Sequence, residues 1–344
     1  MKAKKTATGQ WTCQAYYKDA EGKVHRPRFT AARKSDAERM ASAFSLEHKD
    51  DYKLAKTGNL PITFGEAANR YIRNREAILS PSTVREYYRA LNRSYESILE
   101  VNIHDITRET IQQLVNDWAS YLNPKTVRNL HGFLSSVMKA YRPDFILNTT
   151  MPQKIKPILY TPADHEVKKL IEFVKETRLE IPVILAALSS LRRSEICALT
   201  TDDIGDGWIH VHNALVQDKN KKWVLKTTKT EAGTRITYLP KQATDRIRTL
   251  SPDSGRIVAM NPNMITSSFA HVLKRTNLHK FRFHDLRSYY ASILHYLQVP
   301  DKYIMQWGGW HDEKTLQEHY QRVMQDKIPD MAIIGINHFD RILQ

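Results

Sequence analysis

Four short segments in the second half of the chain carry side chains that could act together on a phosphodiester. Arginine can neutralise a phosphate, lysine and histidine can move protons, and tyrosine can attack as a nucleophile. The segments are SLRRSEICAL (190–199), KTTKTEAGTRITYLP (226–240), FHDLRS (283–288) and GGWHDEKTLQEHYQR (308–322).

Two arginines in these segments, Arg192 and Arg287, have the chemistry needed to bind a phosphate under attack. Negative charge spreads over the non-bridging oxygens in the transition state, and permanently charged guanidinium groups can bind these oxygens with two hydrogen bonds each. His284 lies three residues before Arg287, so on a helix the two side chains share one face. We therefore predict that His284 and Arg287 face the same phosphate.

Tyr320 is the candidate nucleophile. A free phenol has a pKa of about 10 and attacks weakly at neutral pH, unless nearby cations and a base favour loss of its proton. The leaving 5′ oxygen needs a proton, which Lys229 in the predicted β-hairpin could donate. Trp310 offers an indole N–H donor and an apolar ring that could position the tyrosine.

These residues also have interpretations other than the catalytic roles given above. A single tyrosine on an amphipathic helix usually packs, and an arginine near a glutamate usually forms a helix ion pair. The pairs His284–Asp285 and His311–Asp312 suggest a metal phosphohydrolase, but the carboxylate cluster that would hold two cations is missing. We expect no metal in the reaction and, since there is no nucleotide-binding glycine loop, no ATP or other cofactor.

The order Arg, Lys, His, Arg, His or Trp, and Tyr resembles the active site of the tyrosine recombinase, or phage integrase, family. The resemblance implies an arm-site-binding domain, a helical core-binding domain and a catalytic domain that forms a 3′-phosphotyrosyl intermediate. It assigns the catalytic roles to Arg192, Lys229, His284, Arg287, Trp310 and Tyr320, with Glu195 in support.

The sequence departs from the family pattern at two places. Ser190 stands where the family usually has glycine, which puts the local backbone geometry in question rather than the chemistry. Trp310 and His311 are adjacent, and either could be the penultimate active-site residue. His311 matches the commonest spacing to Tyr320, whereas Trp310 directly follows the Gly-Gly pair, and we favour Trp310.

Composition favours a polyanionic partner. The 344 residues include 52 Lys and Arg against 37 Asp and Glu, a net charge of +15 with a pI near 9.6. Cys13 and Cys197 are too few for a disulfide framework and lack zinc-site spacing. With no signal-peptide core and no apolar run of membrane-spanning length, we expect a cytoplasmic, nucleoid-associated protein.

We predict a mainly α-helical protein of three modules. Residues 1–58 form an N-terminal DNA-binding domain, a small β-sheet with strands near 11–17 and 24–30 plus one helix. Residues 59–150 form a core-binding bundle of about four helices, with start signals at Thr63 and Asn123. Residues 158–344 form a mixed, mainly helical catalytic domain with a strand-rich insertion from Trp208 to Leu239.

Several basic residues outside the active site are predicted to reach DNA phosphates, although many such side chains are only solvated. They are Lys4, Lys5, Arg26, Arg28, Lys125, Arg128, Lys221, Lys222 and Arg235.

The resemblance implies an integrase of a phage or other mobile element. Its expected partners are core and arm DNA sites, three further copies in a synaptic homotetramer, and possible excision and host DNA-bending factors. The apolar C-terminal segment, MAIIGINHFDRIL, is expected to dock on a neighbouring subunit or on its own domain. The alternatives are a type IB topoisomerase-like enzyme and a non-catalytic DNA-binding regulator.

Overall fold

The computed structural model describes residues 2–18, 24–47, 62–155, 160–227 and 233–343. The chain divides into two compact units: Met1–Leu79 with Glu86–Ile155, and Ser80–Arg85 with Lys156–Gln344. In the described residues, no helix has the length and apolar character needed to cross a membrane.

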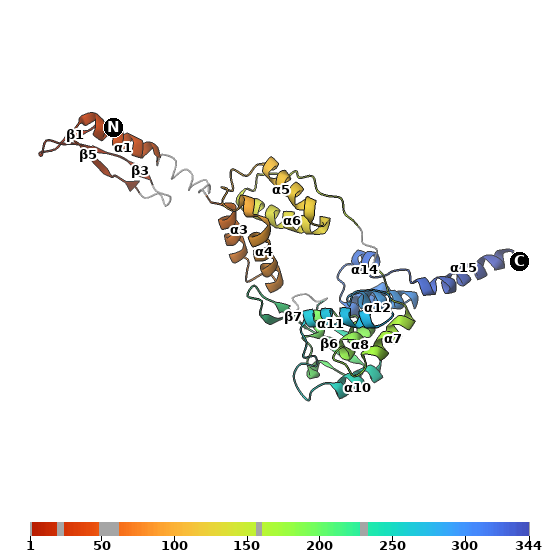
Figure 1. The fold of residues 1–344 in the computed structure, drawn as a ribbon. Helices are drawn as coiled ribbons and strands as arrows, with labels where there is room; N and C mark the ends of the chain where they lie inside the picture. Colours follow the sequence, from red (N-terminus) through yellow and green to blue (C-terminus); the bar gives the residue numbers. More distant parts are fainter. Residues whose placement is uncertain (1, 19–23, 48–61, 156–159, 228–232, 344) are drawn as a thin grey trace. The chain divides into compact units, whose positions relative to one another are not determined.

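The N-terminal module is a small antiparallel sheet covered by one helix (Figure 1). Cys13, Ala15, Ala37 and Ala41 are buried in its small core, so the predicted sheet-plus-helix module is confirmed. The strands are β1 (Lys4–Lys5), β2 (Trp11–Gln14) and β5 (Arg28–Ala31), with a separate pair β3 (Tyr17–Lys18) and β4 (Val24–His25), and the helix is α1 (Lys34–Glu47).

The prediction of one unbroken strand over residues 11–17 is wrong. Strand β2 ends at Gln14, and the next backbone bond runs from Ala15 N to Pro27 O at 2.9 Å. Pro27 has no N–H to complete the ladder, so pairing is interrupted there.

Four helices form the bundle that follows, as predicted: α3 (Phe64–Arg73), α4 (Pro81–Ser94), α5 (Arg108–Tyr121) and α6 (Pro124–Tyr141), with the short 3₁₀ turn η1 (Glu96–Ile98). Thr63 and Glu66 form a capping box at α3, and Asn123 caps α6 ahead of Pro124. Aromatic side chains fill the core, where Tyr95 packs against Phe64, Trp118 and Phe133.

The second unit is built around the buried helix α8 (Glu180–Ser189), which packs against α7 (Asp164–Val174) and α12 (Asp285–Tyr296) (Figure 1). The predicted strand-rich insertion is present as two antiparallel pairs. Strand β6 (Trp208–Val211) pairs with β9 (Arg235–Tyr238), and β7 (Asn213–Gln217) pairs with β8 (Trp223–Thr227).

A smaller apolar cluster in this unit contains Ala291, Ile304, Trp310 and Leu316, with Tyr320 at its edge. This cluster packs α12 against the segment that runs from Ile304 to Tyr320, and it therefore positions Trp310 and Tyr320. The remaining elements are α9 (Arg193–Ile196), η2 (Thr201–Asp203), α10 (Lys241–Leu250), α11 (Pro262–Arg275), α13 (Asp301–Gly308), α14 (Glu313–His319), η3 (Gln325–Lys327) and α15 (Ile328–Leu343).

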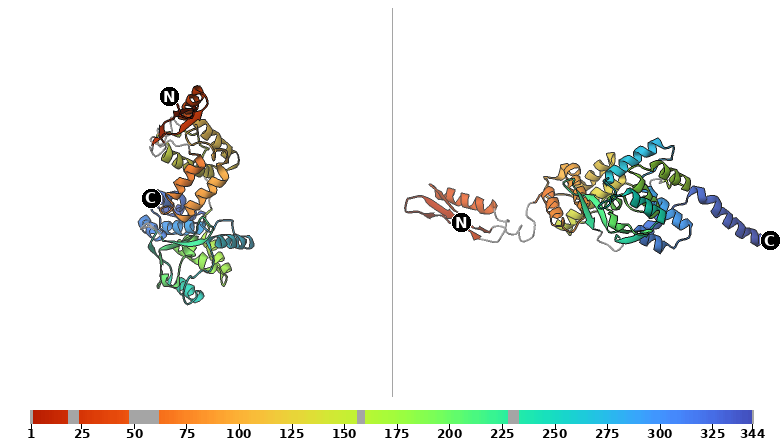
Figure 2. Two further views of the ribbon diagram at one scale, coloured as in Figure 1. Left: turned by 90° about the vertical axis from the view of Figure 1, so that its left-hand side faces the viewer. Right: turned by 90° about the horizontal axis from the view of Figure 1, so that it is seen from below.

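Helix α15 leads to the C-terminus (Figure 2). Its large apolar side chains are exposed. We expected this segment to dock either on a neighbouring subunit or on its own domain. In the structure these side chains are exposed and do not pack on their own domain. The exposed apolar residues are Ile328, Met331, Ile333, Ile334, Ile336, Phe339 and Ile342.

Candidate active site

Tyr320 and His284 meet through their side chains. His284 Nε2 lies 2.9 Å from Tyr320 Oη, a hydrogen-bond distance. His284 immediately precedes α12 and Tyr320 immediately follows α14, so the ends of two helices bring them together. The backbone of Tyr320 is also fixed, because its carbonyl accepts a 2.9 Å bond from Ser292 Oγ.

The surroundings of His284 favour its neutral form. Burial, and then the neighbouring Arg287 guanidinium, lower the pKa of His284 from 6.5 to about 4. At neutral pH the imidazole is therefore uncharged and has a nitrogen that can accept a proton.

Arg287 is fully buried next to the ring of Tyr320. Its guanidinium donates to the carbonyl oxygens of Ser190 and Gly308, and lies 4.6 Å from the Trp310 ring centroid and 5.6 Å from that of Tyr320. Burial and the nearby Arg192 lower the pKa of Arg287. Its Nε is buried without a hydrogen-bond partner among the described residues.

Ser190 stands where the family usually has glycine, and its backbone adopts a conformation that glycine favours. Its φ of 57° and ψ of 27° are left-handed, the region where glycine is favoured, and it ends α8. A serine here carries a backbone cost of roughly 1–2 kcal/mol. The same conformation directs the Ser190 carbonyl to Arg287, so the strained residue holds an active-site side chain.

Arg192 is held from two sides. It donates to Glu195 Oε1 at 2.6 Å and to Gly309 O at 2.9 Å. Arg287 donates to Gly308 O, so the two predicted phosphate-binding arginines hold consecutive carbonyls just before Trp310.

Arg235 was predicted to contact DNA, and the structure contradicts this. Its side chain is only 2% exposed and donates to both carboxylate oxygens of Glu195, at 2.9 and 3.3 Å. Its Nε donates to Trp307 O at 2.9 Å. Each nitrogen of this buried guanidinium donates to a protein acceptor, so the side chain is engaged within the protein and not with a DNA phosphate.

Glu195 lies between Arg192 and Arg235 as a buried, ionised group. Burial alone would raise its pKa, but the guanidiniums of Arg235 and Arg192 lower the pKa of Glu195 to about 2. Sequence reasoning gave Glu195 a supporting role and missed that its principal partner is Arg235.

Trp310 and His311 differ sharply in environment. Trp310 is 5% exposed, its ring centroid is 4.8 Å from that of Tyr320, and its Nε1 is buried without a partner in the described residues. His311 is exposed to solvent. The structure therefore brings Trp310, and not His311, into contact with the tyrosine.

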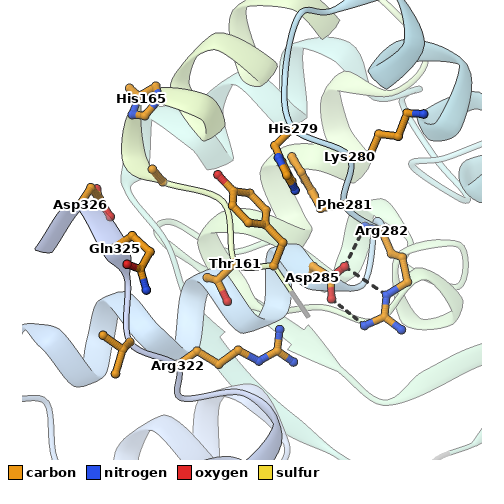
Figure 3. A pocket seen from close by; sticks show the side chains of 13 residues that line it. Thr161, His165, His279, Lys280, Phe281, Arg282, Asp285, Arg322, Gln325 and Asp326 are labelled. Atoms are coloured by element: carbon orange, nitrogen blue, oxygen red, sulfur yellow. Dashed lines mark hydrogen bonds and ion pairs between the residues drawn. The ribbon is translucent and has the colours of Figure 1, made fainter. Parts of the chain in front are cut away.

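A pocket of about 650 Å³ is lined in part by Arg282 and Asp285, whose ion pair sequence analysis missed (Figure 3). Asp285 is buried and accepts hydrogen bonds from Arg282 N, Nε and Nη2 at 2.7, 3.1 and 2.7 Å. This interaction fixes the turn in which His284 lies. It also occupies the Asp285 carboxylate that a metal phosphohydrolase would need.

Lys229 falls outside the described residues, and Arg128 is half-buried and donates to Pro152 O at 2.8 Å. Exposed, and so accessible to a polyanion, are Lys4, Lys5, Arg26, Arg28, Lys125, Lys221 and Lys222.

Family models match both units of the chain. The model described as "Phage integrase family" matches residues 163–326, which contain the cluster around Tyr320. The model described as "Phage integrase, N-terminal SAM-like domain" matches residues 63–119 in the helical bundle. The chain belongs to the phage integrase family, the tyrosine recombinases that act on DNA.

Solved structures share the fold at low sequence identity. A fragment of the Tn1549 transposon integrase, in complex with transposon right end DNA, aligns with a TM-score of 0.67 and 13% identity over 82% of this chain and all of that chain. A lambda integrase tetramer bound to a Holliday junction aligns with a TM-score of 0.58 and 16% identity, covering 94% of this chain and 97% of that one. A search of curated proteins found no match.

Replacing Arg235 with methionine should destabilise the catalytic unit by about 3–5 kcal/mol, because it leaves the buried Glu195 carboxylate with one guanidinium fewer. The pKa of Glu195 is low in the folded protein, so its stabilising contribution is complete above about pH 4.5 and is lost as the pH falls towards 2. In Arg235→Met the pKa of Glu195 in the folded protein should be higher, so the part of the stability that is lost between about pH 4.5 and pH 3 should be smaller, measured by urea unfolding from pH 7 to pH 3.

Arg248→Met is the matched control, because Arg248 forms a partly exposed pair with Asp245. Its effect should stay within about 0.5 kcal/mol. Equal stability losses in the two variants would contradict the structural role given to Arg235.

Proposed function

We propose that this protein is a site-specific tyrosine recombinase that cuts and rejoins DNA with Tyr320 as nucleophile. The observation that carries the proposal is the 2.9 Å contact between Tyr320 Oη and a neutral His284, next to the buried Arg287. A phenol, a base and cations in contact are the groups that phosphoryl transfer to tyrosine requires.

In the proposed reaction, Tyr320 Oη forms a bond to the scissile phosphorus and the bond to the 5′ oxygen breaks. His284 accepts the phenolic proton, and Lys229 donates a proton to the leaving 5′ oxygen. Arg192, Arg287 and the indole N–H of Trp310 bind the non-bridging oxygens. The 3′-phosphotyrosyl bond retains the energy of the broken ester, so the reverse attack by a 5′ hydroxyl reseals the strand without ATP or a metal.

The buried donors of the site support this assignment. Arg287 Nε and Trp310 Nε1 have no acceptor among the described residues, although buried donors are nearly always satisfied. Both groups border Tyr320, and a phosphate at the tyrosine would offer them oxygen acceptors.

We propose that the biological reaction is integration and excision of a mobile element. The three modules would divide at residues 1–58, 59–150 and 158–344, with the first on arm sites and the other two on the core site. The relatives with this fold were solved with transposon end DNA and, as a tetramer, with a Holliday junction. The exposed Lys4, Lys5, Arg26 and Arg28 support a DNA-binding role for the first module.

Tyr320→Phe should abolish covalent attachment to a nicked suicide duplex carrying the protein's own site. Phenylalanine lacks the attacking oxygen, while the ring still packs on Trp310, so DNA affinity should be unchanged. Denaturing electrophoresis measures the adduct and a mobility-shift assay measures affinity. An adduct in the Phe variant would overturn the assignment, and relaxation of plasmids without a site would favour a topoisomerase.

Trp310→Phe should slow single-turnover cleavage by about 10²–10³-fold, the usual cost of losing one donor to transition-state charge. This variant keeps an aromatic ring against Tyr320 and removes the indole N–H together with part of the buried ring system. His311→Ala is the comparison, and it should cleave at close to the wild-type rate because His311 is exposed. Loss of cleavage in His311→Ala alone would make His311 the penultimate residue.

We propose that α15 docks on a neighbouring subunit in a homotetramer, because its exposed apolar face needs a partner and the family resemblance implies that arrangement. Deleting residues 328–344 should preserve binding to a single core site but prevent assembly of the four-subunit complex. Analytical ultracentrifugation on synaptic DNA measures this. Phe339→Asp, a single change on the exposed face, should act in the same direction, and normal assembly by both variants would refute the proposal.

A further inference from the structure

Three side chains that can ligate metal ions lie together in the second unit, and none of them contributes to the cluster around Tyr320. Asp203 ends η2, His210 belongs to β6 and His212 follows that strand, and one ligand atom of each lies within 4.8 Å of the others. We propose that these three residues, the Asp203 cluster, bind a divalent transition-metal ion, with Zn²⁺ as the best-fitting ion. None of the three has a role in the proposed strand transfer, and the proposal does not depend on that function.

A tight turn brings the three residues together. Ile204 and Ile209 form an antiparallel bridge, which places Asp203 next to His210 in the register. His210 and His212 are two residues apart in extended backbone, so both side chains leave the same face of the strand. The pattern Asp-x6-His-x-His therefore brings all three ligands together within one local turn.

The distances fit four-coordinate geometry. His212 Nδ1 lies 3.3 Å from Asp203 Oδ1. In a tetrahedral site with bonds of about 2.0–2.1 Å, ligand atoms are separated by roughly 3.3–3.4 Å. The ligand atom of His210 lies within 4.8 Å of the other two, so the proposed ion would draw the His210 ring closer to them.

Asp203 is already oriented as a ligand. Its Oδ2 accepts from Thr200 N at 2.8 Å and from Thr200 Oγ1 at 2.9 Å, and its Oδ1 faces His212. Such outer hydrogen bonds fix the direction of ligating carboxylates. The guanidinium of Arg248 at the same turn donates to Ile204 O and not to Asp203.

The carboxylate of Asp203 is buried, which favours binding of a cation. The Asp203 side chain is 7% exposed, and the partner in its described ion pair is a histidine, charged only when protonated. A buried carboxylate is costly unless a cation or hydrogen bonds compensate it, and the two hydrogen bonds from Thr200 reach only its Oδ2. A divalent ion would supply the positive charge while both imidazoles stay neutral.

The ligand types select the class of ion. Two imidazoles suit Zn²⁺ and its first-row neighbours, whereas Mg²⁺ and Ca²⁺ prefer oxygen ligands. Three protein ligands leave a fourth position for water, and His212, 34% exposed, keeps the site accessible. A bound ion would tie η2 to β6, the strand paired with the one that carries Arg235.

The test is titration of the full-length, chelator-treated protein with ZnCl₂ in a calorimeter and with CoCl₂ in a spectrophotometer. One equivalent of Zn²⁺ should bind, and Co²⁺ should give the visible absorption of a four-coordinate centre that Zn²⁺ then removes. His210→Ala and His212→Ala should each weaken Zn²⁺ binding by more than about 100-fold, beyond the usual cost of losing an outer-shell partner.

His271→Ala is the matched control, an exposed histidine on α11 that should leave binding unchanged. Asp203 also closes η2, so Asp203→Asn tests folding as well as binding, and circular dichroism of each variant separates the two. Zn²⁺ affinity that is the same in wild type, His210→Ala and His212→Ala would overturn the proposal, as would binding of no Zn²⁺ by the folded wild-type protein.

Discussion

The candidate active site depends on a buried carboxylate held between two guanidiniums. Glu195 binds Arg192 on one side and Arg235 on the other, and each arginine also holds a backbone carbonyl of the segment that leads to Trp310. A buried charge is costly without its partners. Each of these three charged side chains therefore depends on the others for its position. Strand β9, helix α9 and the end of α13 are therefore fixed together by one ionic network.

The sequence predicted the parts of the fold that local chemistry determines. Cap residues such as Thr63 and Asn123 gave helix starts that the structure has, and alternation predicted the N-terminal sheet. The grouping of His284, Arg287 and Tyr320 was predicted because their order along the chain resembled a known active site. Their contacts are consistent with that prediction, and their catalytic roles stay a proposal.

The burial of Arg235 could not be predicted from the pattern of its own strand. In β9 the polar Arg235 and Thr237 are buried, while Ile236 and Tyr238 are exposed, the reverse of the usual alternation. The reason is non-local: Glu195, which lies 40 residues earlier, supplies the charge that makes an inward arginine favourable. The role of Ser190 could not be predicted either. Only the structure shows that its left-handed backbone directs its carbonyl to Arg287.

The network around Glu195 also sets the charge that the site offers to DNA. The guanidiniums of Arg192, Arg235 and Arg287 carry three positive charges, and Glu195 cancels one of them. In the proposed reaction, the phosphodiester brings one negative charge and the phenolic proton passes to His284 within the site, so the assembled transition state keeps a net charge of +1 before Lys229 is counted. Loss of Arg235 would remove one positive charge from this sum and loss of Glu195 would add one, so a change at either residue alters the electrostatic potential at the phosphate as well as the packing.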